Sequence, residues 1–284
     1  MPLTPTGEIV ATAAAGGHAV AAFNVITLEH AEAIVTGAER VGRPVILQVS
    51  QNAVMFHHGR LGAITAAAAA VAADATVPVG LHLDHVTDDA LLRQTPDHGY
   101  GSVMYDASAR PYADNVAATR AAADFAHRHG LWVEAELGTV AGKDGGPPLP
   151  PHAPGARTDP AEAAVFVADT GVDGLAVAVG SSHAMTDRTA ALDHALIAAL
   201  RAAVPVPLVL HGSSGVPDDQ LRRAVAGGMV KVNIGTALNV AYTRAVREGA
   251  PAATDPRTYL TRAREAIAET VAHHVVLLAD PGAA

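Results

Sequence analysis

Apolar and polar positions follow two alternating patterns along the chain. Short apolar runs of strand length are separated by longer, Ala-rich segments whose apolar positions recur with a helical period. We predict strands at residues 19–25, 44–50, 79–85, 101–106, 132–138, 174–182, 207–213 and 230–236. The clearest helical patterns between them cover residues 28–42, 62–75, 112–130 and 160–171. Several of these end in glycine, as helix C-termini often do.

Eight predicted strands, each followed by a helical segment, are typical of a (β/α)8 barrel. The spacing persists to the end of the chain without a change of composition, so we predict a single TIM-barrel domain spanning residues 1–284. A doubly wound open sheet is the alternative. It is disfavoured because no G-x-G-x-x-G turn follows the first predicted strand.

One segment interrupts this regularity. Residues 142–160, "GKDGGPPLPPHAPGARTDP", are rich in Gly and Pro and too long for an ordinary strand-to-helix connection. We predict a mobile loop at about residues 142–158. Because the loop follows a strand with two Glu, we interpret it as a lid over the active site, with a floppy insertion as the alternative.

Polar side chains recur at the ends of the predicted strands. In a barrel, the C-terminal ends of the strands meet at one rim, and the active site lies there. The residues at these ends are Asn24, Ser50, Asp84, His85, Asp106, Glu136, His183, His211 and Asn233. Buried ionisable groups are costly unless they are paired or bind a metal, so we expect these side chains to converge on a functional site.

Three histidines in this set come from separate strands. An all-histidine set with an open position is a type of catalytic zinc site, in which the ion acts as a Lewis acid. We therefore predict that His85, His183 and His211 hold a divalent metal. For any one of them alone, a structural role in the core is the alternative reading.

The other histidines are interpreted structurally. His82 lies two residues before Asp84 and should share its face, so we expect a hydrogen-bonded core histidine. We expect solvated helix or loop positions for His57, His58, His273 and His274. His127 and His129 lie near a predicted helix C-terminus, where a partly positive imidazole suits the dipole.

Two small-residue turns suggest a phosphate site. "HGSSG" at residues 211–215 and "NIGT" at residues 233–236 follow the seventh and eighth predicted strands. Barrels often bind phosphate at these two loops, through backbone N–H groups and hydroxyls that glycine leaves accessible. Each turn alone is also compatible with an ordinary strand-to-helix connection.

Composition narrows the classes of function. The net charge is −9, the pI is about 5.9, and no basic run is present, which argues against nucleic-acid binding. The chain has no cysteine, which excludes thiolate metal sites and a catalytic thiol. No signal peptide or apolar span is indicated, so we expect a cytoplasmic protein without a membrane partner. Only Lys143 and Lys231 could form a Schiff base.

Blocks of sequence along nearly the whole chain resemble a known family. They are "AFNV", "HLDH", "GSVMYDAS", "VEAELGTVAG", "TDPAEAAVFV", "GVDGLAVAVGSSH", "PLVLHGSSGVP", "KVNIGT" and "DPRTYL", in this order. In sequence and spacing they are similar to the class II, metal-dependent ketose-bisphosphate aldolases, which include fructose-bisphosphate and tagatose-bisphosphate aldolases.

The resemblance implies a role for each motif residue. It makes His85, His183 and His211 the ligands of a catalytic zinc ion and Asp84 the acid/base beside the metal. Asp106 and Glu136 match the carboxylates that in some members hold a second metal or an alternative zinc position. The positions assigned to substrate are Asn24, Ser50, Gly212, Ser213, Ser214, Asn233, Ile234, Gly235 and Thr236. The participation of a monovalent cation in phosphate binding is left open.

The chain also departs from the family pattern. A second acid/base, usually Glu in the loop after the fifth strand, is matched by the shorter Asp144. Positions that usually hold Gly are Val86, Ala107 and Ala184, and each adds bulk near the site. Arg257 is a weak candidate for a second phosphate, reaching a neighbouring subunit.

We therefore expect a zinc-dependent aldolase. It would cleave fructose 1,6-bisphosphate, or a close ketose phosphate such as tagatose bisphosphate, to dihydroxyacetone phosphate and an aldehyde such as glyceraldehyde 3-phosphate. By resemblance, it would form a homodimer or homotetramer. The alternatives are a class I aldolase that uses Lys231, a metal-dependent hydrolase and a non-catalytic sugar-phosphate-binding barrel. The hydrolase is disfavoured because "AFNV" lacks the H-x-H pair that such enzymes usually carry on the first strand.

Overall fold

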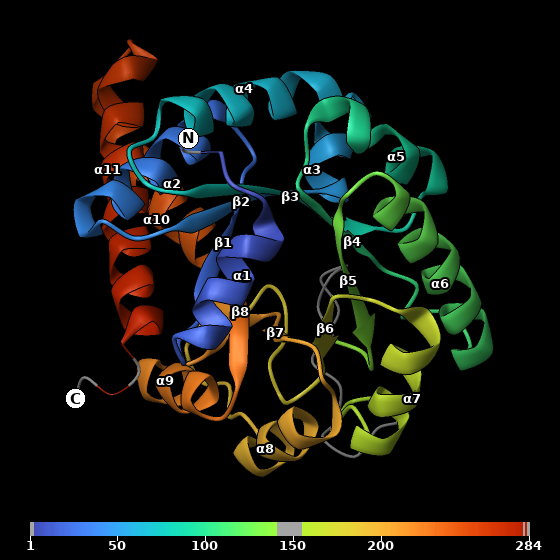
Figure 1. Cartoon of the computed structure of the whole chain (residues 1–284). Coiled ribbons are helices and arrows are strands. Elements are labelled where there is room, and N and C mark those ends of the chain that lie inside the picture. Colours follow the sequence, from blue (N-terminus) through green and yellow to red (C-terminus); the bar gives the residue numbers. More distant parts are fainter. Residues whose placement is uncertain (1–2, 141–154, 281, 283–284) are drawn as a thin grey trace.

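Eight parallel strands form a closed barrel in the computed structural model, which describes residues 3–140, 155–280 and 282 (Figure 1). Each strand pairs with the next, and β1 pairs with β8. The strands are β1 Val20–Asn24, β2 Val45–Ser50, β3 Val79–Val86, β4 Ser102–Tyr105, β5 Trp132–Leu137, β6 Gly174–Val177, β7 Leu208–Leu210 and β8 Met229–Ile234. The predicted (β/α)8 barrel is confirmed, and closure between β1 and β8 excludes the open sheet.

Helices surround the barrel as an outer layer. They are α1 Thr6–Ala15, α2 Leu28–Val41, α3 Gln51–Phe56, α4 Leu61–Asp74, α5 Asp89–Gln94, α6 Tyr112–Arg128, α7 Pro160–Thr170, α8 His194–Ala203, α9 Asp218–Ala226, α10 Thr236–Gly249 and α11 Pro256–Ala279. Short 3₁₀ turns cover Pro96–His98, Ser213–Gly215 and Ala250–Ala252. The four clearest predicted helices all form, with ends within two residues of the predicted ones.

Aspartate and glycine set the ends of several helices. Asp159 accepts hydrogen bonds from the N–H groups of Ala161 and Glu162 at the start of α7, at 2.8 and 3.0 Å. Pro160 follows at the first helical position, where its missing N–H costs nothing. Gly171, with φ of 70°, ends the helix in the left-handed conformation that glycine adopts readily.

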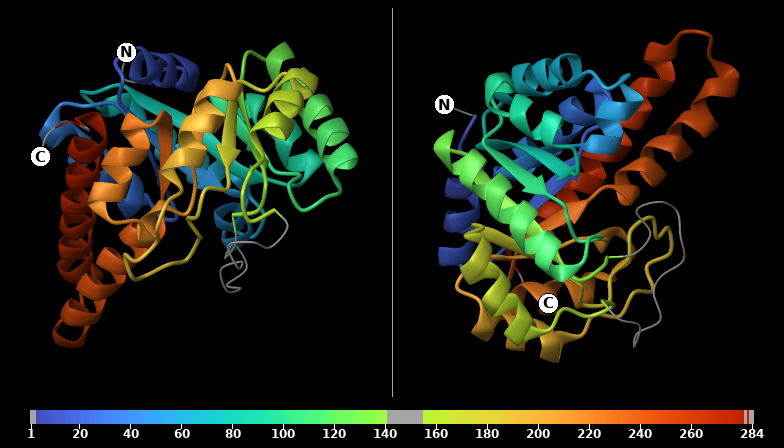
Figure 2. Two further views of the ribbon diagram at one scale, coloured as in Figure 1. Left: turned by 90° about the horizontal axis from the view of Figure 1, so that it is seen from below. Right: turned by 90° about the vertical axis from the view of Figure 1, so that its right-hand side faces the viewer.

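The N-terminal end of the barrel is closed by α1. Ile9, Val10 and Ala13 pack into a buried apolar cluster with Ile46 of β2, against which Trp132 of β5 also packs. In Figure 2 (left), α1 and the yellow loop that follows β6 lie at opposite ends of the strands. The functional residues are therefore confined to the end of the barrel away from α1.

Much of the barrel interior is polar, from Ser102, which donates to Thr6 of α1 at 2.8 Å, to the C-terminal ends of the strands. Alternate residues of a strand face the same side, and here they face inward. The buried polar side chains within the strands and at their ends are Gln48, His82, Asp84, Ser102, Glu134, Glu136, His211, Lys231 and Asn233. Buried polar groups are stable only when they are hydrogen-bonded or paired, so this interior requires a connected network.

Two strands end at least three residues earlier than the sequence pattern predicts. β6 ends at Val177 rather than at residue 182, and β7 ends at Leu210 rather than at residue 213. Gly180 has φ of 116° and Gly212 has φ of 65°, and neither value is compatible with a strand. The predicted strand ends at residues 182 and 213 were therefore wrong, and His183 and His211 lie on loops.

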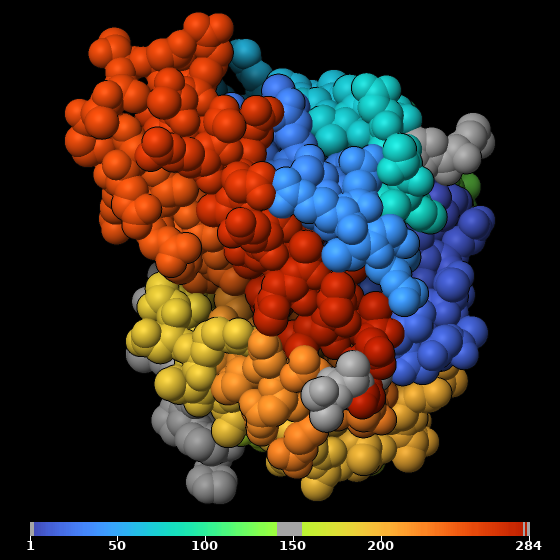
Figure 3. All heavy atoms as spheres, turned by 90° about the vertical axis from the view of Figure 1, so that its left-hand side faces the viewer, coloured from blue at the N-terminus to red at the C-terminus, as the bar shows by residue number. Residues whose placement is uncertain are grey.

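The helical pair α10 and α11 extends beyond the barrel as an arm (Figures 2 and 3). In this pair, α11 packs against α2, and Arg40 of α2 forms a bidentate ion pair with Glu265 of α11 at 2.6 and 2.7 Å. A second ion pair joins Arg264 to Glu32 at 2.6 Å. Within the described residues, no helix is long and apolar enough to cross a membrane.

Candidate active site

A cavity of about 840 Å³ opens at the C-terminal end of the barrel. It is lined by the ends of the strands and by the loops that follow them. Of the residues expected at the site, the lining includes Asn24, Ser50, Asp84, His85, Asp106, Glu136, His183, Gly212, Ser213, Ser214, Asn233, Gly235 and Thr236. The expected convergence on one rim is therefore present in the structure.

A bulge at the end of β3 turns both Asp84 and His85 toward this cavity. Adjacent strand residues normally point to opposite faces. Here the register shifts: Leu83 pairs with Val103, and Val86 pairs with Tyr105, so β3 has one residue more than β4. His85 lies in the bulge with φ of 51°, in the left-handed region. A bulge of this kind redirects a side chain, and it allows two neighbouring residues to share one site.

The three histidines lie together at the cavity floor. The ring centroids are 5.3 Å apart for His85 and His183, 4.8 Å for His85 and His211, and 5.9 Å for His183 and His211. The rings are nearly perpendicular to one another, at 72–86°. One ligand atom from each ring and one Glu136 oxygen lie within 4.8 Å of one another. Three imidazoles and a carboxylate at this spacing fit a divalent ion that prefers nitrogen and oxygen ligands.

Gly212 allows the loop of His183 to approach His211. A Cβ atom at Gly212 would lie 2.5 Å from the backbone carbon of Ser182, closer than any real contact. Its φ of 65° also favours glycine. The glycine after His211 therefore brings together two ligand-bearing loops that are far apart in the sequence.

His211 is held by a buried ion pair. Glu134 Oε1 lies 2.7 Å from His211 Nε2, and Glu134 Oε2 lies 2.8 Å from Lys231 Nζ. All three side chains are fully buried. Lys231 also donates to Asn233 Oδ1 at 2.7 Å. The anionic Glu134 needs a donor, which assigns the His211 proton to Nε2 and leaves Nδ1, 3.4 Å from Glu136 Oε2, facing the cluster.

These contacts shift the ionisation of the network. Burial disfavours the charge on Glu134, but Lys231 and His211 outweigh it and hold the pKa of Glu134 well below its usual range. Burial also opposes a charged His211, yet the hydrogen bond to Glu134 and the negative charges of Glu134 and the nearby Glu136 raise the pKa of His211 to about 9. A metal must therefore displace a proton from His211, and binding should release that proton.

Asp84 lies beside the histidine cluster and is almost fully buried. Its Oδ2 is 4.0 Å from His85 Nε2 and accepts a long hydrogen bond from Gln48 at 3.5 Å. Its Oδ1 is buried and has no hydrogen-bond partner among the residues that the structure describes. Burial raises the pKa of Asp84, but His85, His211, His82 and Lys231 outweigh it and lower the value. The carboxylate is thus ionised and can accept a proton.

Asp106 and Glu136 occupy different places around the histidines. Asp106 Oδ2 lies 3.0 Å from His85 Nδ1, so it orients that ring and is not part of the four-residue cluster. Glu136 is in the cluster. Ser108 joins the two carboxylates, because its hydroxyl lies 2.6 Å from Asp106 Oδ1 and 3.2 Å from Glu136 Oε1.

The loops after β7 and β8 meet at the N-terminus of α10. Ser214 Oγ accepts a hydrogen bond from the Ala237 N–H at 3.1 Å. Ser213 donates its hydroxyl to the Asn233 carbonyl at 2.5 Å, so that hydroxyl proton is already used. Ile234 is fully buried in the core and can reach a ligand only through its backbone. The ends of a helix and of two strands here leave backbone N–H groups near the cavity.

Asn24 and Ser50 lie on the other side of the cavity. Asn24 Oδ1 accepts a hydrogen bond from Gln48 at 2.6 Å and contacts Gly235, where a Cβ would lie 3.0 Å from it. Ser50 caps α3 and accepts a hydrogen bond from the Ala53 N–H at 3.1 Å. Both side chains are therefore fixed in orientation at the cavity wall.

Other predicted positions are placed as follows. His82 is fully buried and hydrogen-bonds Ser102 at 2.8 Å, which confirms the core interpretation; burial and Lys231 lower its pKa to about 3. The solvated interpretation of His274 was wrong, because this side chain of α11 is buried, with its ring edge-on to Phe23 of β1, and burial lowers its pKa to about 4. Arg257 is exposed and pairs with Asp255.

The predicted loop at residues 142–158 is described only in its last part. Asp144 and Lys143 lie outside the described residues. Gly155 accepts a hydrogen bond from the Thr139 N–H at 2.8 Å, and the buried Thr158 donates to the Leu137 carbonyl at 2.5 Å. Thr139 and Val140 line the cavity, and Gly155 is hydrogen-bonded to Thr139, so the described residues that flank positions 141–154 lie beside the site.

Sequence reasoning missed three residues of the network. They are Gln48, Glu134 and Ser108. Gln48 lies two residues before Ser50, and Glu134 lies two residues before Glu136. The two-residue period that placed His82 on the face of Asp84 applies equally to these pairs and could have found both. Ser108 follows the strand and carries no such signal.

Ala184, next to His183, has φ of 59° and is exposed. The left-handed region costs a non-glycine residue about 1–2 kcal/mol. We expect Ala184→Gly to raise the free energy of unfolding by about 0.5–1 kcal/mol, after the larger entropy of the unfolded glycine chain is subtracted. Urea denaturation of the metal-free protein measures this. Ala109→Gly, at a loop alanine without positive φ, should lower stability instead; a loss for both variants contradicts the argument.

A parallel barrel with a histidine-rich metal site at its C-terminal end defines a class of metal-dependent barrel enzymes. The sequence model of the family "Fructose-bisphosphate aldolase class-II" matches residues 4–283. The chain belongs to the class II fructose-bisphosphate aldolase family, whose members are metal-dependent lyases.

Solved structures agree with this assignment. The YdjI aldolase from Escherichia coli K12 is 32% identical, with a TM-score of 0.85 over 99% of this chain and 98% of that one. A putative fructose-1,6-biphosphate aldolase from Coccidioides immitis is 27% identical, with a TM-score of 0.84 over 98% of each chain. Fructose-bisphosphate aldolase from Campylobacter jejuni, at 23% identity and a TM-score of 0.77 over 95% of this chain and 93% of that one, shares the fold.

Proposed function

We propose that this protein catalyses the reversible, zinc-dependent cleavage of a ketose 1-phosphate skeleton into dihydroxyacetone phosphate and an aldehyde. Fructose 1,6-bisphosphate, tagatose 1,6-bisphosphate and other ketose phosphates share the C1 end of that skeleton. The observation that carries the proposal is the convergence of His85, His183 and His211 with Glu136, beside a buried ionised Asp84.

The three histidines would hold the metal, with Glu136 as a further or alternative ligand. A divalent ion bound there supplies Lewis-acid stabilisation of the negative charge that develops on the substrate carbonyl oxygen. Glu134 keeps the Nδ1 lone pair of His211 directed at the cluster. Asp106 orients His85 in the same way, and its role as a ligand of a second metal stays a prediction.

Asp84 would act as the base in cleavage. It takes the proton of the C4 hydroxyl as the C3–C4 bond breaks; C4 becomes the aldehyde carbonyl, and the bonding electrons pass to C3 and the former carbonyl oxygen. A proton then adds to C3 and gives dihydroxyacetone phosphate. Asp84 lines the cavity and its Oδ2 lies 4.0 Å from His85 Nε2 on the side of the cluster, so the carboxylate suits this transfer. Asp144 is proposed as the second acid/base, by resemblance.

The C1 phosphate would bind at the loops after β7 and β8. Gly212 and Gly235 leave room for the ligand against the backbone, and the N-terminus of α10 favours an anion. Ser214 and Thr236 add hydroxyls at the cavity wall. Asn233 binds Lys231 and lies 3.0 Å from His211, so it supports the metal side of the site as well. The participation of a monovalent cation in phosphate binding at this site stays open.

A Schiff-base mechanism at Lys231 is not supported. Nζ of Lys231 is fully buried, is paired with Glu134, and does not line the described cavity. A substrate carbonyl therefore has no path to this amine without disruption of the ion pair that orients His211.

A coupled assay tests the proposal. Zinc-loaded protein is incubated with a panel of ketose phosphates, and dihydroxyacetone phosphate is detected through its reduction by glycerol-3-phosphate dehydrogenase and NADH. We expect turnover of at least one ketose phosphate. Tight binding of the sugar phosphates without any release of dihydroxyacetone phosphate would instead favour a non-catalytic binding protein. The homodimeric or homotetrameric state stays a prediction. Mass photometry of the purified protein would measure it.

A further inference from the structure

The two ends of the cavity differ in chemistry. One end lies at the loops after β7 and β8, where the C1 phosphate is placed. The opposite end is formed by the loops after β2, β3 and β4, and it would receive the part of the substrate that leaves as the aldehyde. Its lining residues are Ser50, Gln51, Asn52, Ala53, Phe56, Thr87, Ser108 and Ala109.

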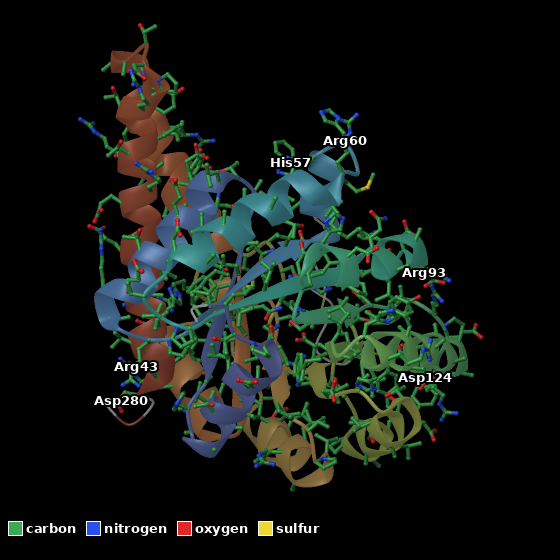
Figure 4. All side chains as sticks on the ribbon, turned by 45° about the horizontal axis from the view of Figure 1, so that its top comes forward. Arg43, His57, Arg60, Arg93, Asp124 and Asp280 are labelled. Atoms are coloured by element: carbon green, nitrogen blue, oxygen red, sulfur yellow. The ribbon has the colours of Figure 1, made fainter. Side chains whose placement is uncertain are left out.

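Among the described residues that line the cavity, none is a lysine or an arginine. Arg60 and Arg93, from the loops and helices behind this end, are exposed and point away from the barrel (Figure 4). Arg110 follows the lining residue Ala109 but does not itself line the cavity, and it lies near Tyr105, whose hydroxyl donates to Asp89 at 2.7 Å. No described cation is therefore placed to receive a second phosphate here.

The charges that do lie nearby are negative. Asp84, Asp106 and Glu136 line the floor, and Thr87 is followed at the rim by Asp88 and Asp89. A divalent metal and one bound phosphate of about −2 cancel each other and leave the floor carboxylates uncompensated. A second dianion beside them would be repelled, and like charges in contact are strongly unfavourable.

Uncharged hydrogen-bonding groups cover this end instead. Gln51 accepts a hydrogen bond from the Thr87 N–H and donates one to the Thr87 hydroxyl, both at 2.9 Å. These two bonds fix the loop that follows β3. The Thr87 and Ser50 hydroxyls then keep a proton to donate. Asn52 is exposed and carries an amide, and Phe56 is 65% exposed at the rim. Hydroxyl, amide and aromatic groups suit the hydroxyls and C–H faces of a sugar chain.

We propose that the preferred substrate carries a single phosphate, on C1, and that the aldehyde released from the other end is an uncharged polyhydroxy aldehyde. This inference rests on the proposed function. The bond changes are those of the aldol cleavage above, so no oxidant or further reactant is required. The acceptor in the reverse direction is then a free sugar aldehyde rather than a sugar aldehyde phosphate.

The reverse direction provides the sharper test. The configurations at C3 and C4 are created in the condensation, so the test does not require a ketose of the correct stereochemistry. Zinc-loaded protein is given dihydroxyacetone phosphate with matched pairs of aldehydes that differ only in a phosphate: glycolaldehyde and its phosphate, glyceraldehyde and glyceraldehyde 3-phosphate, erythrose and erythrose 4-phosphate. Consumption of dihydroxyacetone phosphate gives kcat/KM. We expect each free aldehyde to exceed its phosphate by at least about tenfold.

The outcomes separate the two proposals. If the phosphorylated aldehydes are used equally well or better, the inference about the substrate is overturned and the aldolase function stands. If no aldehyde consumes dihydroxyacetone phosphate, the aldolase function itself fails. Electrostatic repulsion also predicts that the disadvantage of the phosphates shrinks at high salt, whereas a purely steric preference would not change.

A charge introduced at this end gives an independent check. Asn52→Arg should raise kcat/KM for the phosphorylated aldehydes relative to the free ones by about tenfold, because it supplies the missing cation. Asn52→Gln is the matched control and should leave that ratio as in the wild type. An unchanged ratio in the Asn52→Arg protein would show that the charge of this end does not set the preference, which overturns the inference.

Discussion

Removal of divalent metal with a chelator is expected to reduce aldol cleavage by at least about 10³-fold, because Lewis-acid stabilisation is worth several kcal/mol. The structure offers no substitute for the ion. No lysine or arginine lines the described cavity, and Lys231 is committed to Glu134. Negative charge on the substrate carbonyl oxygen would then meet only carboxylates and imidazoles.

The measurement pairs activity with metal content. Zinc or cobalt added back to the chelator-treated protein should restore activity in proportion to the metal bound. His211→Ala should lower metal affinity and resist rescue at equal metal concentration, whereas His273→Ala, at an exposed position outside the cluster, should behave as the wild type. Full activity in protein shown to be free of metal would contradict the proposed function.

Substitution of Asp84 by Asn is expected to lower kcat by about 10²–10⁴-fold, the range typical of a lost general acid/base. Asn has the same shape as Asp but cannot accept the C4 hydroxyl proton. Because Asp84 is not part of the four-residue cluster, metal content should remain close to that of the wild type. The separation of turnover from metal binding is the decisive feature of this variant.

Asp88→Asn serves as the matched control. Asp88 is exposed, caps α5 through the Ala90 N–H at 2.8 Å, and lies only four residues from Asp84. A helix cap contributes about 1 kcal/mol, and Asn caps nearly as well as Asp, so Asp88→Asn should lower the free energy of unfolding by only a fraction of that amount. It should leave kcat unchanged. A wild-type kcat in Asp84→Asn would remove Asp84 from its proposed role, and a loss of metal in that variant would assign it to the metal site instead.

Much of this fold is readable from the chain. The alternation of apolar strands with amphipathic helices and the regular spacing predicted the barrel, and the positions of polar residues at strand ends predicted where the site lies. His85, His183 and His211 could be chosen because the carboxyl ends of parallel strands share one rim. The lengths of β6 and β7 were overestimated. The apolar run continues past Val177 to Val179, and the polar residues after Leu210 were counted as strand, although the backbone turns at Gly180 and Gly212.

The sequence alone therefore determined the elements, their order and the chemical types at the mouth, since these depend on local periodicity and on the parallel topology. The tertiary structure decided how the side chains meet. Only the β3 bulge directs both Asp84 and His85 inward, and only the fold places Glu134 of β5 between Lys231 of β8 and His211. Glu134 lies 77 positions from His211 and 97 positions from Lys231 in the sequence. A local pattern cannot encode these contacts, because they depend on the closure of the barrel.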